Sequence, residues 1–271
     1  MPLYQVLIYA IIQGITEFLP VSSSAHLAIL PQLMHWEDPG LSFDIALHVG
    51  TLLAVVGYFF KDWIQIIGQG FGLTIGTDEE LKQNKMLLWL IVVATIPIGI
   101  AGKLLNEKAE NEWRTLLLMG TMLVIVGIVM WFAERFGAQT RDLTGIVWID
   151  AIVIGLLQAL AIVPGTSRSG ITITAGLFRG LKREAAARFS FLLLTPAVAG
   201  AAVLALLKLK KAGGIPADMR MPFVVGILVS AVVGALVIGL FLKYIKGKSL
   251  YPFIYYRIVF GIIVVALALF R

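Results

Sequence analysis

The sequence contains no cysteine among its 271 residues. Disulfide bonds, zinc sites built on thiolates and phosphatases with a cysteine nucleophile are therefore excluded. Charged residues are also scarce, at 14%, whereas 59% of the residues are hydrophobic, well above the share of about 45–50% in soluble domains. The chain therefore belongs in a lipid bilayer. Its net charge of +6 does not indicate a nucleic-acid partner, because the 22 basic residues lie scattered between apolar runs.

Six apolar stretches are long enough to cross a membrane, which takes about 20 helical residues. We expect these transmembrane helices at 43–60, 86–104, 115–132, 190–208, 222–243 and 253–270. Two other apolar stretches, 3–34 and 148–178, contain a proline followed by small hydroxyl residues, which favours helix breaks at Pro20 and Pro164. Because broken backbone at membrane depth must be buried in protein or line a wet cavity, we expect both to be re-entrant helix-loop-helix hairpins.

The beginning of the chain lacks the basic start and the small-residue cleavage site of a signal peptide. We therefore expect the first hairpin to remain in the mature protein.

The two halves of the chain resemble each other. Gln13–His26 reads QGITEFLPVSSSAH and Gln158–Gly170 reads QALAIVPGTSRSG, with prolines 144 positions apart. Each half, 1–136 and 145–271, would hold one hairpin and three transmembrane helices. Because three crossings is an odd number, the second half has to be inverted in the membrane, as in proteins whose broken helices meet around a polar ligand. The expected fold is an all-α membrane domain, 1–271, with an inverted-topology repeat.

Lys and Arg residues are unevenly distributed between the two sides of this topology. Fourteen lie on one side and eight on the other, and the richer side should face the cytoplasm. The mouth of the first hairpin, with Glu17 and Ser23, would then face the outside of the cell.

Two pairs of polar residues in the first half have helical spacing. Gln13 and Glu17 are four residues apart and share a helix face, and an ionisable residue inside a membrane segment is a functional candidate by default. A role for Glu17 in reaching the interface or in pairing with a neighbouring helix stays open. Asp44 and His48 have the same spacing on the next helix, where they would extend the polar cavity or contribute to a metal site. Since two candidate ligands are weak evidence, a supporting role is favoured for both.

Hydroxyl groups and an imidazole follow the first break, at Ser22, Ser23, Ser24 and His26. A serine hydroxyl can act as a nucleophile, and a histidine suits proton transfer near neutral pH. Ser23 and His26 are three residues apart and would share a helix face, where they can converge with Glu17 as nucleophile, base and orienting group. We expect Ser22 and Ser24 to contribute to phosphate binding. A helix cap and a structural histidine are the alternatives.

The second hairpin contains PGTSRSGIT at Pro164–Thr172, which indicates an anion site. Arg168 lies at the expected start of a helix, where free N–H groups favour negative charge, and its guanidinium can bind two phosphate oxygens. The hydroxyl groups around it belong to Thr166, Ser167, Ser169 and Thr172. A phosphoryl-transfer transition state spreads charge over its oxygens, so donors already in position supply most of the catalysis. The alternative is a structural salt bridge between Arg168 and Glu17.

The two motifs resemble those of the undecaprenyl-diphosphate phosphatase family, the integral-membrane, bacitracin-resistance type, and the spacing of the apolar segments agrees over the whole chain. The resemblance implies a catalytic set of Glu17, Ser23, His26 and Arg168. It also implies that Ser167, Ser169 and Thr172 support the phosphate. Gln13 occupies a place where the family has Glu or Gln, so it is expected to support Glu17.

The resemblance further implies hydrolysis of undecaprenyl diphosphate to undecaprenyl phosphate and inorganic phosphate. The reaction would take place on the outer face of the bacterial inner membrane and would recycle the lipid carrier of cell-wall synthesis. Mg²⁺ or Ca²⁺ is an implied cofactor, with Glu17 as a candidate ligand, and a homodimer fits the family.

Two other functions compete with this interpretation. A polyprenyl-phosphate transporter or flippase would use the same anion site without hydrolysis, because paired broken helices are common in transporters. The phosphatidate type of membrane phosphatase requires a histidine soon after the Ser-Arg pair. The three histidines, His26, His35 and His48, all lie in the first half of the chain, which argues against that type.

Overall fold

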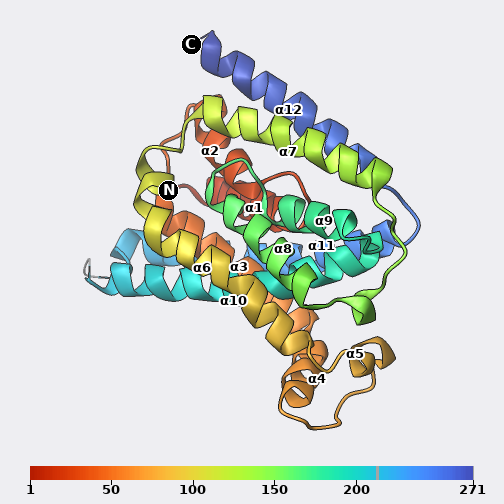
Figure 1. The fold of residues 1–271 in the computed structure, drawn as a ribbon. Helices are drawn as coiled ribbons and strands as arrows, with labels where there is room; N and C mark the ends of the chain where they lie inside the picture. Colours follow the sequence, from red (N-terminus) through yellow and green to blue (C-terminus); the bar gives the residue numbers. More distant parts are fainter. Residues whose placement is uncertain (212–213, 271) are drawn as a thin grey trace.

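The computed structural model describes residues 1–211 and 214–270 (Figure 1). This part of the chain is helical, and its one β-bridge, between Arg141 and Leu181, lies outside any strand. The helices are α1 (Leu3–Thr16), α2 (Ser23–Met34), α3 (Leu41–Tyr58), α4 (Phe60–Gly70), α5 (Glu79–Gln83), α6 (Leu87–Asn111), α7 (Leu116–Phe136), η1 (Leu143–Gly145), α8 (Trp148–Ala159), η2 (Leu160–Ile162), α9 (Arg168–Phe178), α10 (Arg183–Lys211), η3 (Ala217–Met219), α11 (Arg220–Ile245) and α12 (Tyr251–Leu269).

Within the described residues, five helices are long and apolar enough to span a membrane by themselves, namely α6, α7, α10, α11 and α12. The sixth expected span, 43–60, corresponds to α3, and it is followed by α4 after a bend of 72°. The short amphipathic helix α4 and the helix α5 were not expected from the sequence. The prediction of an all-α integral membrane protein is confirmed.

The two predicted hairpins are pairs of short helices, α1–α2 and α8–α9, and both break where expected. Just before the second helix of each pair, Ser22 and Ser167 have positive φ values of 74° and 68°. This conformation costs a residue with a Cβ atom about 1 kcal/mol or more. Gly165, with φ 91°, leaves no room for a side chain, since an added Cβ would lie 2.4 Å from the carbonyl oxygen of Met119. The backbone is therefore held in a strained course at both breaks.

The short helices lie in the middle of the molecule, between the α7–α12 pair and the layer of α3, α6 and α10 (Figure 1). α1 packs on α11, and α8 packs on α6. α7 and α12 approach closely at two glycines, because a Cβ on Gly120 or Gly261 would lie within 3.0 Å of the other residue's carbonyl oxygen. A contact in which each glycine faces the other, one from each half of the chain, is expected where the two halves are structural repeats. The division into 1–136 and 145–271 stays a prediction, and residues 212–213 and 271 lie outside the described part.

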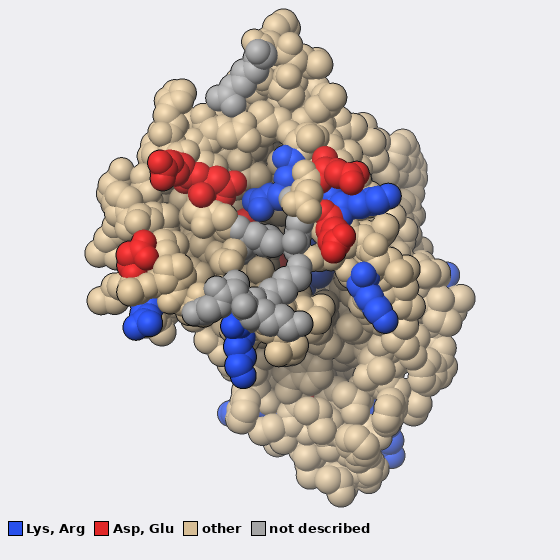
Figure 2. Space-filling view, turned by 90° about the vertical axis from the view of Figure 1, so that its left-hand side faces the viewer, with Lys and Arg blue, Asp and Glu red and all other residues tan. Residues whose placement is uncertain are grey.

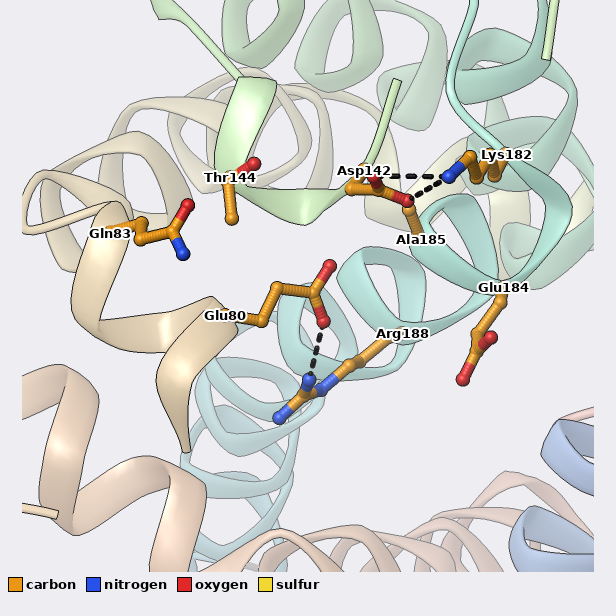
Figure 3. Close-up of a pocket in the computed structure, with 8 residues that line it drawn as sticks. All are labelled: Glu80, Gln83, Asp142, Thr144, Lys182, Glu184, Ala185 and Arg188. Atoms are coloured by element: carbon orange, nitrogen blue, oxygen red, sulfur yellow. Dashed lines mark hydrogen bonds and ion pairs between the residues drawn. The ribbon is translucent and has the colours of Figure 1, made fainter. Parts of the chain in front are cut away.

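Charged side chains occupy a limited part of the surface. Figure 2 shows acidic and basic side chains close together in a band across one face, with further Lys and Arg side chains below this band. Near α5, the guanidinium of Arg188 contacts the carboxylates of Asp62, Asp78 and Glu80 at 2.7, 2.8 and 3.0 Å. A cavity of about 380 Å³ lies beside Glu80 and Arg188 (Figure 3). These ion pairs tie α4, α5 and the connecting loop to the start of α10.

The carboxyl group of Asp78 gives a test of this network. Burial raises its pKa, but hydrogen bonds from the Leu81 N–H and from Arg188 outweigh burial and hold the pKa below its ordinary value. The carboxylate therefore stabilises the fold above the unfolded pKa of about 3.9, and this contribution is lost as the pH falls through the lower folded value. We expect Asp78→Asn to lower the Tm in detergent by about 2–4 °C at pH 7, and this difference should shrink as the pH falls through the folded pKa of Asp78.

The matched control is Asp142→Asn, because Asp142 forms an exposed pair with Lys182 at 2.8 Å. Exposed pairs contribute little, so this variant should change the Tm by less than about 2 °C. Equal Tm shifts for the two variants at pH 7 would contradict the assignment of Asp78 to a stabilising network.

Candidate functional site

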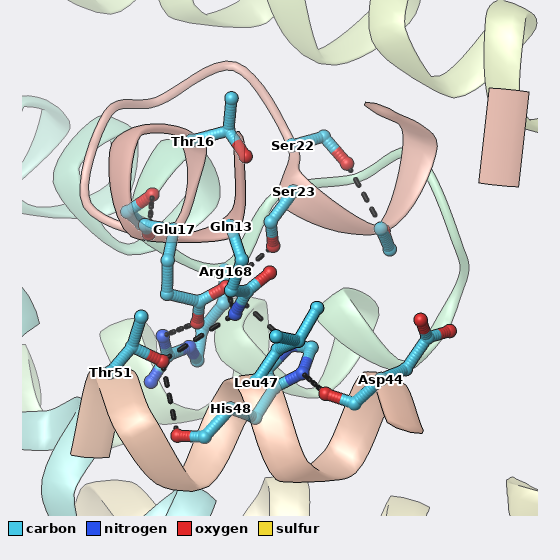
Figure 4. A network of polar contacts seen from close by, with 12 residues as sticks. Gln13, Thr16, Glu17, Ser22, Ser23, Asp44, Leu47, His48, Thr51 and Arg168 are labelled. Atoms are coloured by element: carbon cyan, nitrogen blue, oxygen red, sulfur yellow. Dashed lines mark hydrogen bonds and ion pairs between the residues drawn. The ribbon is translucent and has the colours of Figure 1, made fainter. Parts of the chain in front are cut away.

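Glu17 is the point at which the two helix breaks meet (Figure 4). Its carboxylate is buried, and its Oε1 accepts a hydrogen bond from Arg168 Nη2 at 2.5 Å. Its Oε2 accepts from Ser23 Oγ at 2.5 Å and from Gln13 Nε2 at 3.2 Å. The structure thus brings together four of the predicted residues from α1, the start of α2 and the start of α9. The salt bridge between Glu17 and Arg168, considered above as an alternative, is present.

The hydroxyl groups of the second hairpin mostly shape the backbone. Ser169 Oγ donates to the carbonyl oxygens of Glu17 and Leu19 at 3.2 and 3.1 Å, which joins the two breaks directly. Ser167 Oγ accepts from the N–H of Gly170 at 3.1 Å and so caps α9. Thr172 Oγ1 lies 2.6 Å from Ser190 Oγ and donates to its own helix. The geometry gives these three residues a positioning function in addition to any contact with phosphate.

Two potential anion donors have no partner among the described residues. Arg168 Nη1 and Thr166 Oγ1 are buried and make no hydrogen bond. A buried polar group left unsatisfied costs about 1–3 kcal/mol. Both donors belong to the second break and are therefore candidates for hydrogen bonds to a bound anion. Gln13 Oε1 is also buried without a partner, although it is an acceptor.

Ser22 and Ser24, the other predicted phosphate-binding residues, lie at the first turn of α2. Their hydroxyl groups are 3.2 Å apart. The N–H of Gly165 donates to Ser24 Oγ at 3.4 Å, so this hydroxyl also joins the first hairpin to the second. Ser24 is exposed and Ser22 is buried.

His26 is not placed beside Ser23 and Glu17 as the spacing predicted. Its Nδ1 lies 2.7 Å from the carbonyl oxygen of Ser22, so Nδ1 carries a proton, and its Nε2 lies 2.7 Å from the hydroxyl of Tyr256. The ring stacks on Phe260 with centroids 4.5 Å apart. Aromatic side chains of α12 thus turn the imidazole away from the carboxylate. This correction concerns the contact, and the role of His26 in catalysis stays a prediction.

His48 is the imidazole that faces Glu17. Its Nε2 lies 3.5 Å from Glu17 Oε2, and its Nδ1 lies 2.7 Å from the carbonyl oxygen of Asp44. The Asp44 carboxylate pairs with Arg114 at 2.9 Å and therefore points away from Glu17. Thr51 Oγ1 donates to the carbonyl oxygen of His48 at 3.0 Å and accepts from Gln13. Gln13 and His48 thus contact Glu17 and Asp44 does not, and the supporting roles of the three residues stay predictions.

The side chains do not form a ready metal site. No group of three or more His, Asp or Glu residues in the described chain is arranged to hold a metal ion. Both oxygens of Glu17, the candidate ligand, already accept hydrogen bonds, and one of them faces the positive charge of Arg168. A divalent cation bound by Glu17 would have to displace these donors, so the arrangement does not fit a resident ion.

Arg257 on α12 is a polar residue of this region that the sequence analysis did not single out. Its side chain is fully buried and contacts the backbone of both helix breaks. The signal was available, since an arginine within the apolar stretch 253–270 is unusual in a transmembrane helix.

The chemistry available at the site is phosphoryl or acyl transfer. The Ser23 hydroxyl donates a hydrogen bond to a buried carboxylate, which is the arrangement of a nucleophile and its base. Arg168 lies on the other oxygen of the same carboxylate and keeps one unpaired N–H group for a negatively charged group.

Comparison with known proteins gives a consistent result. The family model described as bacitracin resistance protein BacA matches residues 6–263. The chain is 45% identical over 271 residues to an undecaprenyl-diphosphatase of Pelotomaculum thermopropionicum, covering 100% of this chain and 98% of the relative. It is 45% identical over 267 residues to an undecaprenyl-diphosphatase of Moorella thermoacetica, covering 98% of both chains. A relative of that name in Trichlorobacter lovleyi is 46% identical over 268 residues, covering 98% of this chain and 97% of the relative.

The unpartnered hydroxyl of Thr166 gives a test of anion binding. We expect Thr166→Val to leave the Tm without ligand unchanged or slightly higher, because the lost hydroxyl makes no hydrogen bond in the described chain. The same change should weaken binding of pyrophosphate by about 2–10-fold, through the loss of one donor. The measurement is the Tm of purified protein as a function of pyrophosphate concentration.

The matched control is Thr174→Val on the same helix, whose hydroxyl donates to the carbonyl oxygen of Gly170 at 2.6 Å. It should lower the Tm without ligand and leave the affinity for pyrophosphate unchanged. A Thr166→Val protein that is destabilised but binds pyrophosphate normally would show that this hydroxyl is not an anion donor.

Proposed function

The chain belongs to the family of bacitracin resistance protein BacA, and we propose that it hydrolyses undecaprenyl diphosphate to undecaprenyl phosphate and inorganic phosphate. The observation that carries this proposal is the hydrogen bond from Ser23 Oγ to the buried Glu17 carboxylate, with Arg168 on the other oxygen. A transporter or flippase would need an anion site but no hydroxyl bonded to a carboxylate base. The contact therefore favours hydrolysis over transport.

In the proposed reaction, Ser23 Oγ attacks the terminal phosphorus of the diphosphate and Glu17 takes the hydroxyl proton. The bond from the terminal phosphorus to the bridging oxygen breaks, and undecaprenyl phosphate leaves. Water then hydrolyses the phosphoserine and releases inorganic phosphate. A variant in which His26 is the nucleophile stays open, although both nitrogens of its ring already have partners.

The ion pair between Glu17 and Arg168 couples proton transfer from Ser23 to stabilisation of the charge on the transferred phosphoryl group. While Glu17 is ionised, it holds one N–H group of Arg168. Protonation of Glu17 by Ser23 removes the negative charge from the carboxylate. The guanidinium of Arg168 can then donate its hydrogen bonds to the phosphate oxygens instead of to Glu17. Charge stabilisation would thus increase at the moment when negative charge develops on the transferred phosphoryl group.

The environment of the reaction is also a proposal. The prenyl chain would remain in lipid while the diphosphate lies between the helix breaks, with the site open to the outer face of the bacterial inner membrane. Undecaprenyl phosphate released there would return to cell-wall synthesis. Mg²⁺ or Ca²⁺, where it is required, would arrive with the diphosphate oxygens, because the side chains offer no ready ligand set. A homodimer is part of the same proposal.

The first test is phosphate release from undecaprenyl diphosphate by purified protein. We expect turnover by the wild type and a loss of at least about 100-fold in Ser23→Ala, Glu17→Gln and Arg168→Met, because each variant removes the nucleophile, the base or the phosphate donor. Thr16→Val is the matched control, since its hydroxyl donates to the carbonyl oxygen of Ile12 in its own helix. Folded wild-type protein that releases no phosphate, with or without Mg²⁺ or Ca²⁺, would favour the transporter.

The covalent step gives a second test. Acid quenching during turnover should trap a phosphoryl group on Ser23, because phosphoserine survives acid whereas phosphohistidine does not. Mass spectrometry of peptides locates the label, and Ser23→Ala is the control. A parallel alkaline quench preserves phosphohistidine, and a phosphoryl group found on His26 only after that quench and retained in Ser23→Ala would assign the nucleophile to the histidine.

A further inference from the structure

Arg257 is a fully buried arginine without a carboxylate partner among the described residues. Its guanidinium contacts carbonyl oxygens of the backbone instead. Nε donates to Leu123 on α7 at 3.1 Å, and Nη1 donates to Pro20 at 3.1 Å. Nη2 donates to Gly165 and Thr166 at 3.3 and 3.0 Å. One side chain of α12 therefore bonds to α7 and to both helix breaks.

Besides the ion pair between Glu17 and Arg168, the two breaks have few other direct connections. Ser169 joins α9 to the carbonyl oxygens of Glu17 and Leu19, and Ser24 meets the N–H of Gly165. Arg257 adds a charged group that holds the carbonyl oxygens at the turning points of both loops. Since Ser23 follows the first loop and Arg168 follows the second, the distance between nucleophile and phosphate donor depends on how these loops are held.

The position of this charge is unfavourable for stability alone. Burial of a cation without a counter-ion is unfavourable, and its hydrogen bonds to carbonyl groups offset only part of the lost hydration. The guanidinium also lies against the first turn of α9, since a Cβ on Gly170 would be 2.6 Å from Arg257 Nη1. The helix dipole disfavours a cation at this end. A buried charge in such a place is therefore expected to serve binding or catalysis.

We propose that Arg257 is a positioning residue for the hydrolysis of the diphosphate. It fixes the two helix breaks against each other, so that Ser23 and Arg168 face the same phosphorus. Its charge also remains after Glu17 and Arg168 neutralise each other, and the diphosphate neutralises it on binding. The inference rests on the proposed function for its chemistry, but the clamp between the loops exists independently of turnover.

Substitution of Arg257 by lysine or by methionine separates the effect of its charge from the effect of its hydrogen-bond geometry. A guanidinium has five N–H donors in a planar fork, whereas an ammonium has three donors on a flexible stem. Arg257→Lys keeps the charge but cannot hold carbonyl groups on three segments at once. Arg257→Met loses both. The matched control is Arg183→Met, because Arg183 is a half-buried arginine that pairs with Glu134 at 2.7 Å, away from the breaks.

The test compares kcat, KM and Tm of the three variants with undecaprenyl diphosphate. We expect Arg257→Lys to keep KM within about 3-fold of the wild type while kcat falls at least about 10-fold, since a small misplacement of reacting groups can cost up to about 100-fold in rate. Arg257→Met should also raise KM. Arg183→Met should lower the Tm with kcat nearly unchanged. Wild-type kcat in Arg257→Lys, or kcat in Arg257→Met equal to that of Arg183→Met, would overturn the proposal.

A distance measurement tests the clamp without turnover, and the absence of cysteine makes labelling specific. Spin labels on cysteines at two exposed positions, Leu33 on α2 and Phe178 on α9, report the separation of the hairpins. We expect a narrow distribution in the wild type and in Arg183→Met, and a broader one in Arg257→Lys. Unchanged width in Arg257→Lys would overturn the clamp, whereas an inactive wild type with a broadened Arg257→Lys would refute only the proposed function.

Discussion

The buried ion pair between Glu17 and Arg168 is the interaction on which the rest of the structure depends. It joins residues 151 positions apart, at the ends of two broken helices. Loss of either charge would be costly in this environment, because it would leave the other charge of the pair buried without its counter-ion. The pair therefore requires both helices to end at the same depth, and Ser23, Gln13 and Ser169 gather around it.

The broken helices are the means by which an apolar chain places polar groups inside a membrane. An unbroken helix satisfies its own N–H and C=O groups and offers side chains alone, whereas a break exposes backbone groups to a ligand. The strained φ values at Ser22 and Ser167 show that this geometry is imposed by packing around the loops. The hydrogen bonds from Arg257 to backbone carbonyl oxygens and the close contact between Gly165 and Met119 supply part of that packing.

The positive charges of the site are only partly balanced by carboxylates of the described chain. Glu17 neutralises one arginine, Arg257 has only carbonyl groups for partners in the described chain, and Arg168 retains an unpaired N–H group. In the proposed reaction, the diphosphate would supply negative charge and hydrogen-bond acceptors to these groups. The hydrogen bond from Ser23 to the Glu17 carboxylate suits hydrolysis, and an anion carrier would not need it. It agrees with the name undecaprenyl-diphosphatase that the relatives carry.

The sequence by itself determined the membrane-spanning helices, the breaks near Pro20 and Pro164, and the pairing of Glu17 with an arginine as one of two alternatives, but not the helices α4 and α5. These features follow from local rules, since hydropathy, proline and helical spacing act within a few residues. Tertiary structure alone decided that His26 turns to Tyr256 while His48 faces the carboxylate. Which face of a helix meets which neighbour depends on the packing of distant segments, and no local pattern contains that information.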